Sequence, residues 1–300
     1  MNECVNIGDD ISLSEAVERV SVELAASGVF FGHGTFNADE EAAWLVLAAC
    51  GIPVDADTIP WNQQIDQQQA SAVKRLLERR IQSRKPLAYL LEEAWFAGYS
   101  FHVDERVLVP RSHLTEWIPD RFAPWIQPES VWDVLDLCCG SGCIGIATAL
   151  VLPECQVLLS DISRDALDVA QINIHRHELQ DRVAVHHADG LSGLQQRFDL
   201  ILCNPPYVSS GAMAALPPEY QAEPALGLES GLDGIDFIRA LLSSVTHNLK
   251  PGGTLIVEAG SAGETVMAEW PDVPFTWLGT DSDEPVLFLL TYESLVASGF

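Results

Sequence analysis

Short apolar runs alternate with longer amphipathic segments over the second half of the chain. The apolar runs predict buried strands at residues 131–135, 156–160, 183–187, 198–203 and from 254. The segments between them predict helices that begin near residues 142, 164 and 233. Because strands alternate with helices, we expect right-handed crossovers and a parallel sheet.

The last part of the chain has a different pattern. Residues 275–278 and 286–290 are apolar runs that flank a polar stretch over residues 279–284. Two short strands joined by a polar turn form a hairpin. We therefore expect one strand of the sheet to be antiparallel to the others.

The first part of the chain has a helical pattern. Asn37 and Glu40 are typical of a helix start, and Gly51 with Pro53 is typical of its end. A second helix is expected from about residue 63 to residue 84. Beyond it, the alternating pattern predicts a short hairpin formed by residues 99–103 and 106–109.

A glycine-rich turn follows the first predicted strand. Gly140, Gly142 and Gly145 fit the pattern G-x-G-x-x-G between a strand and a helix, and Asp161 ends the next strand. This arrangement is typical of nucleoside cofactor sites, where the turn admits the cofactor and the acid accepts the ribose hydroxyls. A plain glycine turn with a solvated aspartate is the alternative.

Asp136 indicates which nucleoside cofactor fits. It lies four residues before Gly140, at the end of the predicted strand. A carboxylate there repels a pyrophosphate that lies over the turn, as in NAD. It suits a cofactor with an amine and a sulfonium, so the sequence favours S-adenosyl-L-methionine. A nicotinamide oxidoreductase is the alternative from another class of enzyme.

The tetrapeptide Asn204-Pro-Pro-Tyr207 follows the predicted strand at residues 198–203. It therefore lies where open α/β sheets bind ligands. The Asn204 amide oxygen and the Pro205 carbonyl are two acceptors for a planar –NH2 group, and Tyr207 offers a flat ring. Asn204, Pro205 and Tyr207 are thus the predicted catalytic residues, although an ordinary proline turn is the alternative.

These two motifs together resemble the S-adenosylmethionine-dependent methyltransferases that act on amino or amide nitrogens. Among these, the chain resembles the protein-glutamine branch over nearly its whole length. The resemblance extends to the connecting segments 86–90 and 107–111 and to Glu116. Enzymes of this branch that modify release factors usually carry glycine where Cys138 stands. Those that modify large-subunit ribosomal protein L-three carry cysteine there and have segments like 31–34, 216–228 and 271–278.

The resemblance implies a Rossmann-like seven-stranded class I methyltransferase sheet, preceded by a small helical domain. It places a substrate-recognition domain at residues 1–92, a hairpin linker at 93–115 and the methyltransferase domain at 116–300. The implied substrate is one glutamine of ribosomal protein L-three. Release factors, and then DNA adenine, are the alternative substrates.

The resemblance also implies a role for each site residue. Asp136 is expected at the methionine amine, Asp161 at the ribose and Asp189 near the adenine, although Asp189 also reads as an ordinary loop residue. The residues expected to bind the cofactor are Asp136, Cys138, Gly140, Gly142, Asp161, Asp189 and Asn204. Those expected to bind the substrate are Asn204, Pro205, Pro206, Tyr207, Glu219 and Glu223.

The chain has a formal net charge of −27. Beyond Arg197 its only basic residues are Arg239 and Lys250, so the region of the tetrapeptide lacks cations to neutralise DNA phosphates. We expect Glu219 and Glu223 to attract a basic protein. The alternatives are that they satisfy local backbone donors, and that the acidity is an adaptation to salt.

One basic segment runs from Lys74 to Lys85 on this acidic chain. It suits ribosomal RNA or an acidic partner, and a solvated helix face is the alternative.

The cysteines indicate packing and not a metal site. Seven are present, and the cluster of Cys138, Cys139 and Cys143 lacks a C-x-x-C pair. Such cysteine usage fits a reducing cytoplasm. Residues 1–4 do not begin a secretory signal, and the apolar runs are too short to span a bilayer. We expect a cytoplasmic enzyme without a metal.

Overall fold

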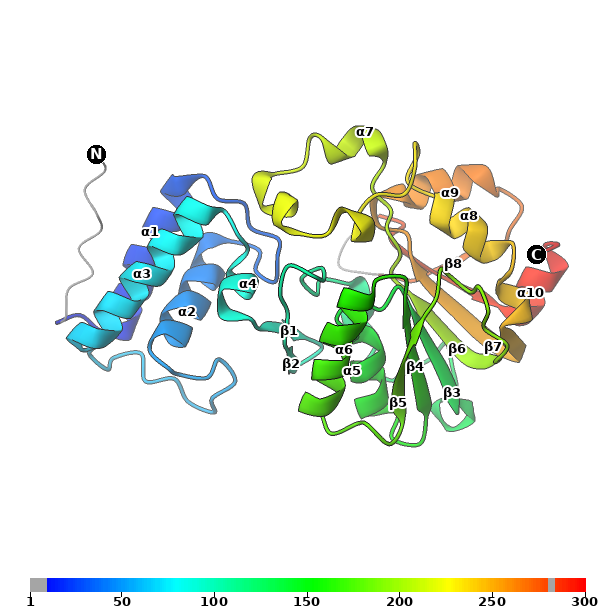
Figure 1. Cartoon of the computed structure of the whole chain (residues 1–300), viewed down its shortest axis with the longest axis horizontal. Coiled ribbons are helices and arrows are strands. Elements are labelled where there is room, and N and C mark those ends of the chain that lie inside the picture. The colour runs from blue at the N-terminus through cyan, green and yellow to red at the C-terminus, as the bar shows by residue number, and fades with distance from the viewer. Residues whose placement is uncertain (1–9, 280–283) are drawn as a thin grey trace. The chain divides into compact units, whose positions relative to one another are not determined.

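The computed structural model describes residues 10–279 and 284–300, which form two compact units (Figure 1). The first unit holds the described residues up to Glu93 together with Pro217–Ala222. The second unit holds Ala94–Leu216 and Glu223–Phe300. The predicted three-part division remains a prediction, and it did not include the return of Pro217–Ala222 to the first unit. Residues 1–4, considered for a signal, and 280–283 of the predicted turn lie outside the described residues.

The first unit is helical. Side-chain caps begin three of its helices: Ser12 and Asp66 form capping boxes, and the Asn37 side chain accepts from the Glu40 N–H. The apolar stripes of these helices bury residues such as Leu24 and Leu45. The helices are α1 (Leu13–Ser27), α2 (Ala38–Ala49), α3 (Gln67–Ser83) and α4 (Leu87–Leu91).

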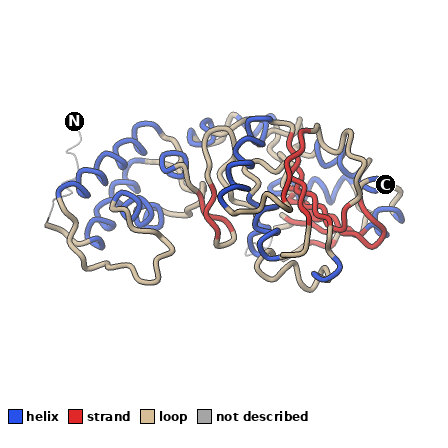
Figure 2. Tube along the Cα trace, turned by 60° about the horizontal axis from the view of Figure 1, so that its bottom comes forward, coloured by secondary structure: helices blue, strands red, loops and turns tan. Residues whose placement is uncertain are grey.

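The predicted hairpin exists, but one of its strands differs. β1 (Ala94–Phe96) pairs antiparallel with β2 (Tyr99–Phe101), so the strand predicted at 99–103 is found as β2, whereas the strand predicted at 106–109 was wrong. Ala97 and Gly98 both have positive φ, which suits the tight turn between β1 and β2. Figure 2 shows this pair apart from the large sheet of the same unit. Residues 106–109 contribute instead to the wall of a cavity.

The second unit contains the predicted sheet of seven strands, in the order β5-β4-β3-β6-β7-β9-β8. The strands from β5 to β7 are parallel, and β9 runs antiparallel between β7 and β8. The predicted antiparallel strand near the end of the chain is therefore confirmed. The strands are β3 (Asp133–Leu137), β4 (Gln156–Asp161), β5 (Val183–His187), β6 (Phe198–Cys203), β7 (Leu249–Glu258), β8 (Thr276–Trp277) and β9 (Leu287–Thr291).

Helices cover both faces of this sheet (Figure 1). One apolar core joins alternate strand residues such as Val134 and Leu202 to α5 and α6. The other joins Leu135 and Cys203 to α8, α9 and α10. The strand alternation puts Asp136 on the α5 face. The helices are α5 (Cys143–Val151), α6 (Arg164–Arg176), α7 (Ser210–Met213), α8 (Asp236–Leu242), α9 (Gly263–Glu269) and α10 (Tyr292–Ala297).

An ion-pair cluster joins three strands at the edge opposite their carboxyl ends. The Lys250 ammonium lies 2.6 Å from a carboxylate oxygen of Asp133 and 2.9 Å from one of Asp199. Asp199 also accepts from the backbone N–H groups of Trp132 and Asp133. The cluster therefore fixes where β3, β6 and β7 begin.

Among the described helices, none is long and apolar enough to cross a membrane.

Candidate active site

Two loops leave the sheet side by side, because β3 and β6 are adjacent parallel strands. The last residues of these strands, Leu137 and Cys203, are register partners. The glycine turn and the Asn204–Tyr207 tetrapeptide therefore begin at the same edge of the sheet. A cavity of about 410 Å³ lies there, within the second unit, and both loops line it. A ligand-sized space at the carboxyl ends of the strands is what the sequence predicts.

The glycines of the turn meet two different requirements. Gly140 has φ +53°, and a Cβ there would meet no atom within 4 Å, so its backbone is open to a ligand. Gly142 has φ +78°, and its Cβ would lie 2.8 Å from Leu159 Cδ1. Gly145 is tighter still, with its Cβ 2.3 Å from Leu159 Cδ2. Gly142 and Gly145 therefore let α5 pack closely on β4, and only Gly140 lines the cavity.

Asp136 lies beneath the turn and does not line the cavity. One carboxylate oxygen accepts from the Gly145 N–H at 2.8 Å, and the other, Oδ1, is buried without a hydrogen-bonding partner. The expected direct contact with a cofactor amine is therefore corrected to a supporting position under the turn. The unpartnered oxygen still creates a negative electrostatic potential under the turn, which suits a cationic ligand above it.

Burial also changes the acidity of Asp136. It raises the pKa of this carboxyl to about 7, the Gly145 N–H opposes the change, and the nearby Asp161 carboxylate adds to it. The group is thus near its midpoint at neutral pH in the ligand-free protein. A cation bound above the turn favours the ionised form.

Asp161 lies at the end of β4, where the sequence predicted a ribose acceptor, and it lines the cavity. Its two carboxylate oxygens accept from the backbone N–H groups of Gly140 and Ser163, at 2.9 and 2.8 Å. Burial raises the pKa of Asp161, and these backbone donors oppose the rise. They also fix the carboxylate at the cavity wall, and each oxygen keeps a lone pair for a ligand.

The charge around the cavity suits a cationic cofactor. Asp161 and Asp189 line it, and Asp189 is exposed. The two arginines of the lining are paired within the chain: Arg106 lies 2.6 Å from a carboxylate oxygen of Asp104, and Arg111 hydrogen-bonds Glu223. The cavity therefore presents carboxylates to a ligand, while both of its arginines already have acidic partners. These residues fit S-adenosyl-L-methionine and disfavour a pyrophosphate.

The tetrapeptide is closely packed against its surroundings. Asn204, Pro205, Pro206 and Tyr207 all line the cavity, with Pro205 buried and Asn204 half-buried. Two further glycines hold Tyr207. A Cβ on Gly260 would lie 2.5 Å from the Tyr207 ring, and one on Gly234 would lie 2.5 Å from the Tyr207 carbonyl oxygen. Both glycines have positive φ, so larger residues there would displace the ring.

Some residues that support or line the cavity were not expected from the sequence. Gly234 and Gly260 hold Tyr207 without lining the cavity, and they lie 27 or more positions beyond it with no recognisable motif around them. Residues 106–112 were interpreted as a hairpin strand and a connection, yet they line the cavity. Pro110 and the two arginines of that segment carried a signal only through the family resemblance.

The cysteine cluster packs as small side chains. Cys138 lines the cavity in a left-handed conformation, with φ +60°. Burial, together with the Asp136 carboxylate, raises the pKa of Cys143 to about 12, and the same causes raise the pKa of Cys139. These two buried thiols therefore stay protonated at neutral pH and are poor metal ligands. Within the described ranges, no group of three or more His, Cys, Asp and Glu side chains is placed to bind a metal.

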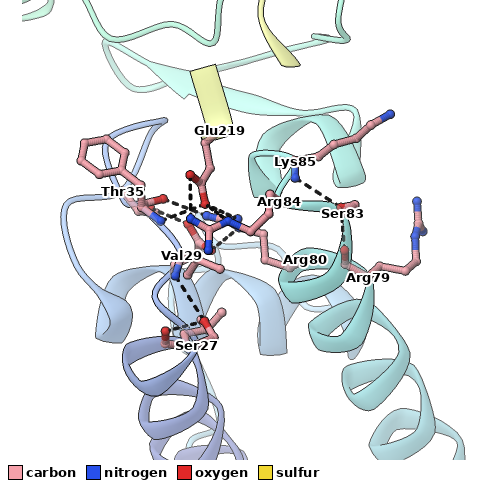
Figure 3. A network of polar contacts seen from close by, with 12 residues as sticks. Ser27, Val29, Thr35, Arg79, Arg80, Ser83, Arg84, Lys85 and Glu219 are labelled. Atoms are coloured by element: carbon pink, nitrogen blue, oxygen red, sulfur yellow. Dashed lines mark hydrogen bonds and ion pairs between the residues drawn. The ribbon is translucent and has the colours of Figure 1, made fainter. Parts of the chain in front are cut away.

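The two glutamates expected to face a basic substrate face inward instead. Glu219, in the first unit, is fully buried, and its carboxylate lies 2.8 Å from the Arg84 guanidinium (Figure 3). Glu223, in the second unit, is buried and accepts from Arg111 and from the Val109 N–H. A basic substrate cannot use carboxylates that already have partners inside the chain. The predicted substrate contact is corrected to a structural anchoring role.

The buried Asp136 generates a prediction about pH. Its pKa is about 7 in the folded chain against an ordinary value of 3.8, so the folded state holds a proton that the unfolded state loses. Stability from this group is fully present below pH ~4 and is lost as pH rises through about 7. The isosteric Asp136→Asn variant avoids this loss. Its stability advantage over wild type should grow with pH between those values, by at most about 1.4 kcal/mol per pH unit.

Urea unfolding of the cofactor-free proteins at a series of pH values measures this difference. Asp181→Asn replaces an exposed carboxylate and controls for the loss of one charge. If the difference in unfolding free energy between wild type and Asp136→Asn stays constant between pH 4 and 8, the assignment of a raised pKa is contradicted.

Comparisons with known proteins found a family model and similar solved structures. A family model described as "Methyltransferase small domain" matches residues 122–216. Among solved structures, the hMettl16 catalytic domain in complex with a MAT2A 3'UTR hairpin is similar, with a TM-score of 0.49 and 16% identity. That alignment covers 74% of this chain and 80% of the other.

Curated relatives are much more similar. A ribosomal protein uL3 glutamine methyltransferase of Neisseria gonorrhoeae is 42% identical over 271 residues, which are 90% of this chain and 91% of the relative. A protein of the same name from Francisella tularensis is 42% identical over 276 residues, with 91% and 88% covered. At this identity and coverage, the chain belongs to the family of ribosomal protein uL3 glutamine methyltransferases.

Proposed function

We propose that this chain methylates the side-chain amide nitrogen of one glutamine in ribosomal protein uL3, with S-adenosyl-L-methionine as methyl donor. The observation that carries the proposal is the shared cavity at the ends of β3 and β6, lined by Asp161 and by Asn204–Tyr207. The names of the curated relatives support the substrate. A ribosomal protein substrate implies a cytoplasmic reaction. Family membership argues against the nicotinamide alternative.

The cofactor half of the cavity has a distinct task for each residue. Asp161, held by two backbone donors, accepts the ribose hydroxyls. The open backbone at Cys138 and Gly140 lets the cofactor approach the turn, and Asp189 lies at the adenine side. Asp136 supports the turn from beneath through the Gly145 N–H and favours the amine electrostatically. When bound, S-adenosyl-L-methionine supplies an electrophilic methyl group on sulfur.

The tetrapeptide half holds the nucleophile. An amide nitrogen is a weak nucleophile because its lone pair is delocalised into the carbonyl. The Asn204 side-chain oxygen and the Pro205 carbonyl accept the two amide hydrogens, which localises electron density on the nitrogen and orients it. Tyr207, seated on Gly260, bounds the pocket. Positioning and electrostatics then provide most of the rate enhancement, and no metal takes part in this mechanism.

The substrate proposal predicts the outcome of a direct comparison. Purified uL3 and purified release factors are each incubated with the enzyme and labelled cofactor. We expect methyl transfer to uL3 on a single glutamine, identified by mass spectrometry, and little transfer to release factors. A strong preference for release factors would favour that alternative and refute the proposal.

Two control substrates complete this comparison. Duplex DNA tests the adenine alternative, which the paired Arg106 and Arg111 at the cavity disfavour. uL3 with its modified glutamine replaced tests whether one site accounts for all of the label. Residual labelling of that variant would show that the reaction is not specific to one side chain.

The mechanism predicts a sharp effect of Asn204→Ala. Because Asn204 acts on the nucleophile, its loss should lower kcat by at least ~10²–10³-fold, the usual cost of removing one oriented hydrogen-bonding group. Calorimetry should show S-adenosylhomocysteine binding within about threefold of wild type. Near-normal turnover at saturating cofactor would contradict the amide-holding role, and a lost cofactor site would place Asn204 on the cofactor instead.

We further propose that α3 contacts ribosomal RNA, through fewer cations than its sequence suggests. Arg80 is buried against Glu41, and Arg84 pairs with Glu219, so these two are not available to RNA. Arg75 and Arg79 are exposed and lie one helical turn apart. Figure 3 shows Arg79 and Lys85 directed away from the Glu219 cluster. Lys74 is half-exposed beside Arg75.

The double variant Arg75→Gln/Arg79→Gln tests this contact. Binding to a ribosomal RNA fragment should weaken, and the slope of log K against log salt should fall by up to about two. Methylation of free uL3 should not change, because no RNA takes part in that assay. RNA binding identical to wild type would show that this helix face is merely solvated.

A further inference from the structure

A buried carboxylate holds the segment Pro217–Ala222 in the first unit. One Glu219 oxygen accepts from the Phe30 N–H at 2.9 Å and lies 2.8 Å from Arg84 Nε. The other accepts from Arg84 Nη2 at 3.1 Å, and Arg80 Nη1 lies 3.4 Å from the first oxygen. Figure 3 shows the carboxylate directed at both guanidinium groups. Donors from two elements thus converge on one side chain.

Further hydrogen bonds hold Arg80, one of these donors, in place. Arg80 is 1% exposed, its Nε donates to Glu41 at 2.7 Å, and its Nη2 donates to the Phe30 carbonyl at 2.9 Å. Glu41 accepts in turn from the Thr35 hydroxyl at 3.1 Å. The guanidinium is therefore held between α2 and the loop that begins at Phe30. The same guanidinium also donates from Nη1 to Glu219, its third acceptor.

Aromatic packing adds a non-polar part to the same contact. Tyr220 follows Glu219 and lies edge-on to the His33 ring, with ring centroids 4.6 Å apart. Phe30 lies 5.7 Å from Tyr220 between centroids. The residue pair Glu219-Tyr220 thus contacts the loop of residues 30–35 through charge and through rings. Both parts position the segment, and the charged part defines its register because its geometry is directional.

The pKa of Glu219 agrees with a permanently ionised anchor. Burial alone raises it, but the Phe30 N–H and the Arg84 guanidinium lower it more, so the net shift is downward. The anchor therefore keeps its charge at neutral pH. Removing one partner of such a cluster leaves the other charged and buried, which costs more than the pair itself contributes.

The loop that carries Glu219 starts directly after the tetrapeptide. Directly after Tyr207, Val208 forms a bridge with Glu229 and exchanges backbone hydrogen bonds with Leu228 and Ser230. This bridge closes the base of the loop in the second unit. Glu223 ties a further point of the loop to Arg111 in that unit. Between these points, the chain passes through the first unit at Pro217–Ala222.

We propose that Glu219 is a positioning residue for the protein substrate, which anchors the loop after the tetrapeptide to the helical unit through Arg84 and Arg80. The inference rests on the proposed function and on the helical unit as a substrate-recognition domain. A substrate protein that contacts both Pro217–Ala222 and the helices of the first unit needs this segment in a fixed register on those helices. A short peptide around the glutamine needs only the cavity.

The test uses Glu219→Gln, which keeps an oxygen acceptor for the Phe30 N–H but loses the charge. We expect KM for uL3 to rise at least tenfold, with kcat at saturating uL3 within about twofold of wild type. KM for a short glutamine-containing peptide and the Kd for S-adenosylhomocysteine should each stay within about twofold. A merely structural role would change protein and peptide methylation by the same factor, and that result would overturn the proposal.

Arg84→Gln provides a second, milder variant, because this arginine is 29% exposed. It should reproduce the KM effect, and it decides the question if Glu219→Gln does not fold. The double variant should be no worse than either single variant, since the contact is already lost. Arg79→Gln, on the same helix but outside the cluster, is the matched control and should behave like wild type with free uL3. An equal defect in Arg79→Gln would mean that general charge and not the anchor matters.

The outcomes separate this inference from the proposed function. If wild-type protein does not methylate uL3, the proposed function fails first. If wild type methylates uL3 and the Glu219 and Arg84 variants match it in KM, the anchor has no part in substrate binding and the inference alone fails.

Discussion

The arrangement of the site depends on the parallel pairing of β3 with β6. Strand order reverses at this pair, with β4 and β5 on one side and β7 to β9 on the other. Register partners Leu137 and Cys203 end together, so the two loops that carry the chemistry leave the sheet at adjacent points. These loops are 66 residues apart in the chain. The Lys250 cluster fixes the opposite ends of the same strands, which keeps the register that brings them together.

The glycine turn and the loop after the tetrapeptide are stabilised in different ways. The turn is held by backbone: Asp161 and Asp136 accept from its N–H groups, and glycines allow close packing of α5. The loop is held by ion pairs, through Arg111 with Glu223 in the second unit and through the arginines of the Glu219 cluster in the first unit. A single side-chain substitution therefore affects the anchoring of the loop more directly than it affects the backbone hydrogen bonds of the turn.

The sequence predicted the sheet well because each strand has a continuous apolar pattern and each motif lies directly beside its strand. Prediction from the sequence failed where a residue's partner lies far away along the chain. Glu219 reads as a solvated loop residue between prolines, and its partners Arg80 and Arg84 lie 135 or more positions away. One hairpin strand was misplaced because residues 94–96 and the mostly apolar residues 106–109 both suit a partner for residues 99–101, and the tight turn at Ala97-Gly98 selects the former. Asp136 was assigned to the right region, but strand alternation puts it on the buried α5 face.

The buried ion pairs of the loop are better understood as determinants of conformation than as sources of stability. Taking charges out of water costs about as much as their attraction returns, so well-packed apolar residues would hold the loop comparably. Apolar contacts, however, tolerate sliding by a residue or a rotamer. Two carboxylates four positions apart, each matched to its own arginine, do not tolerate it, because a shifted loop leaves a buried charge without a partner. On a chain with 16 Lys and Arg against 43 Asp and Glu, three of the scarce arginines are used at these two points, so the position of this loop depends on a few specific side chains.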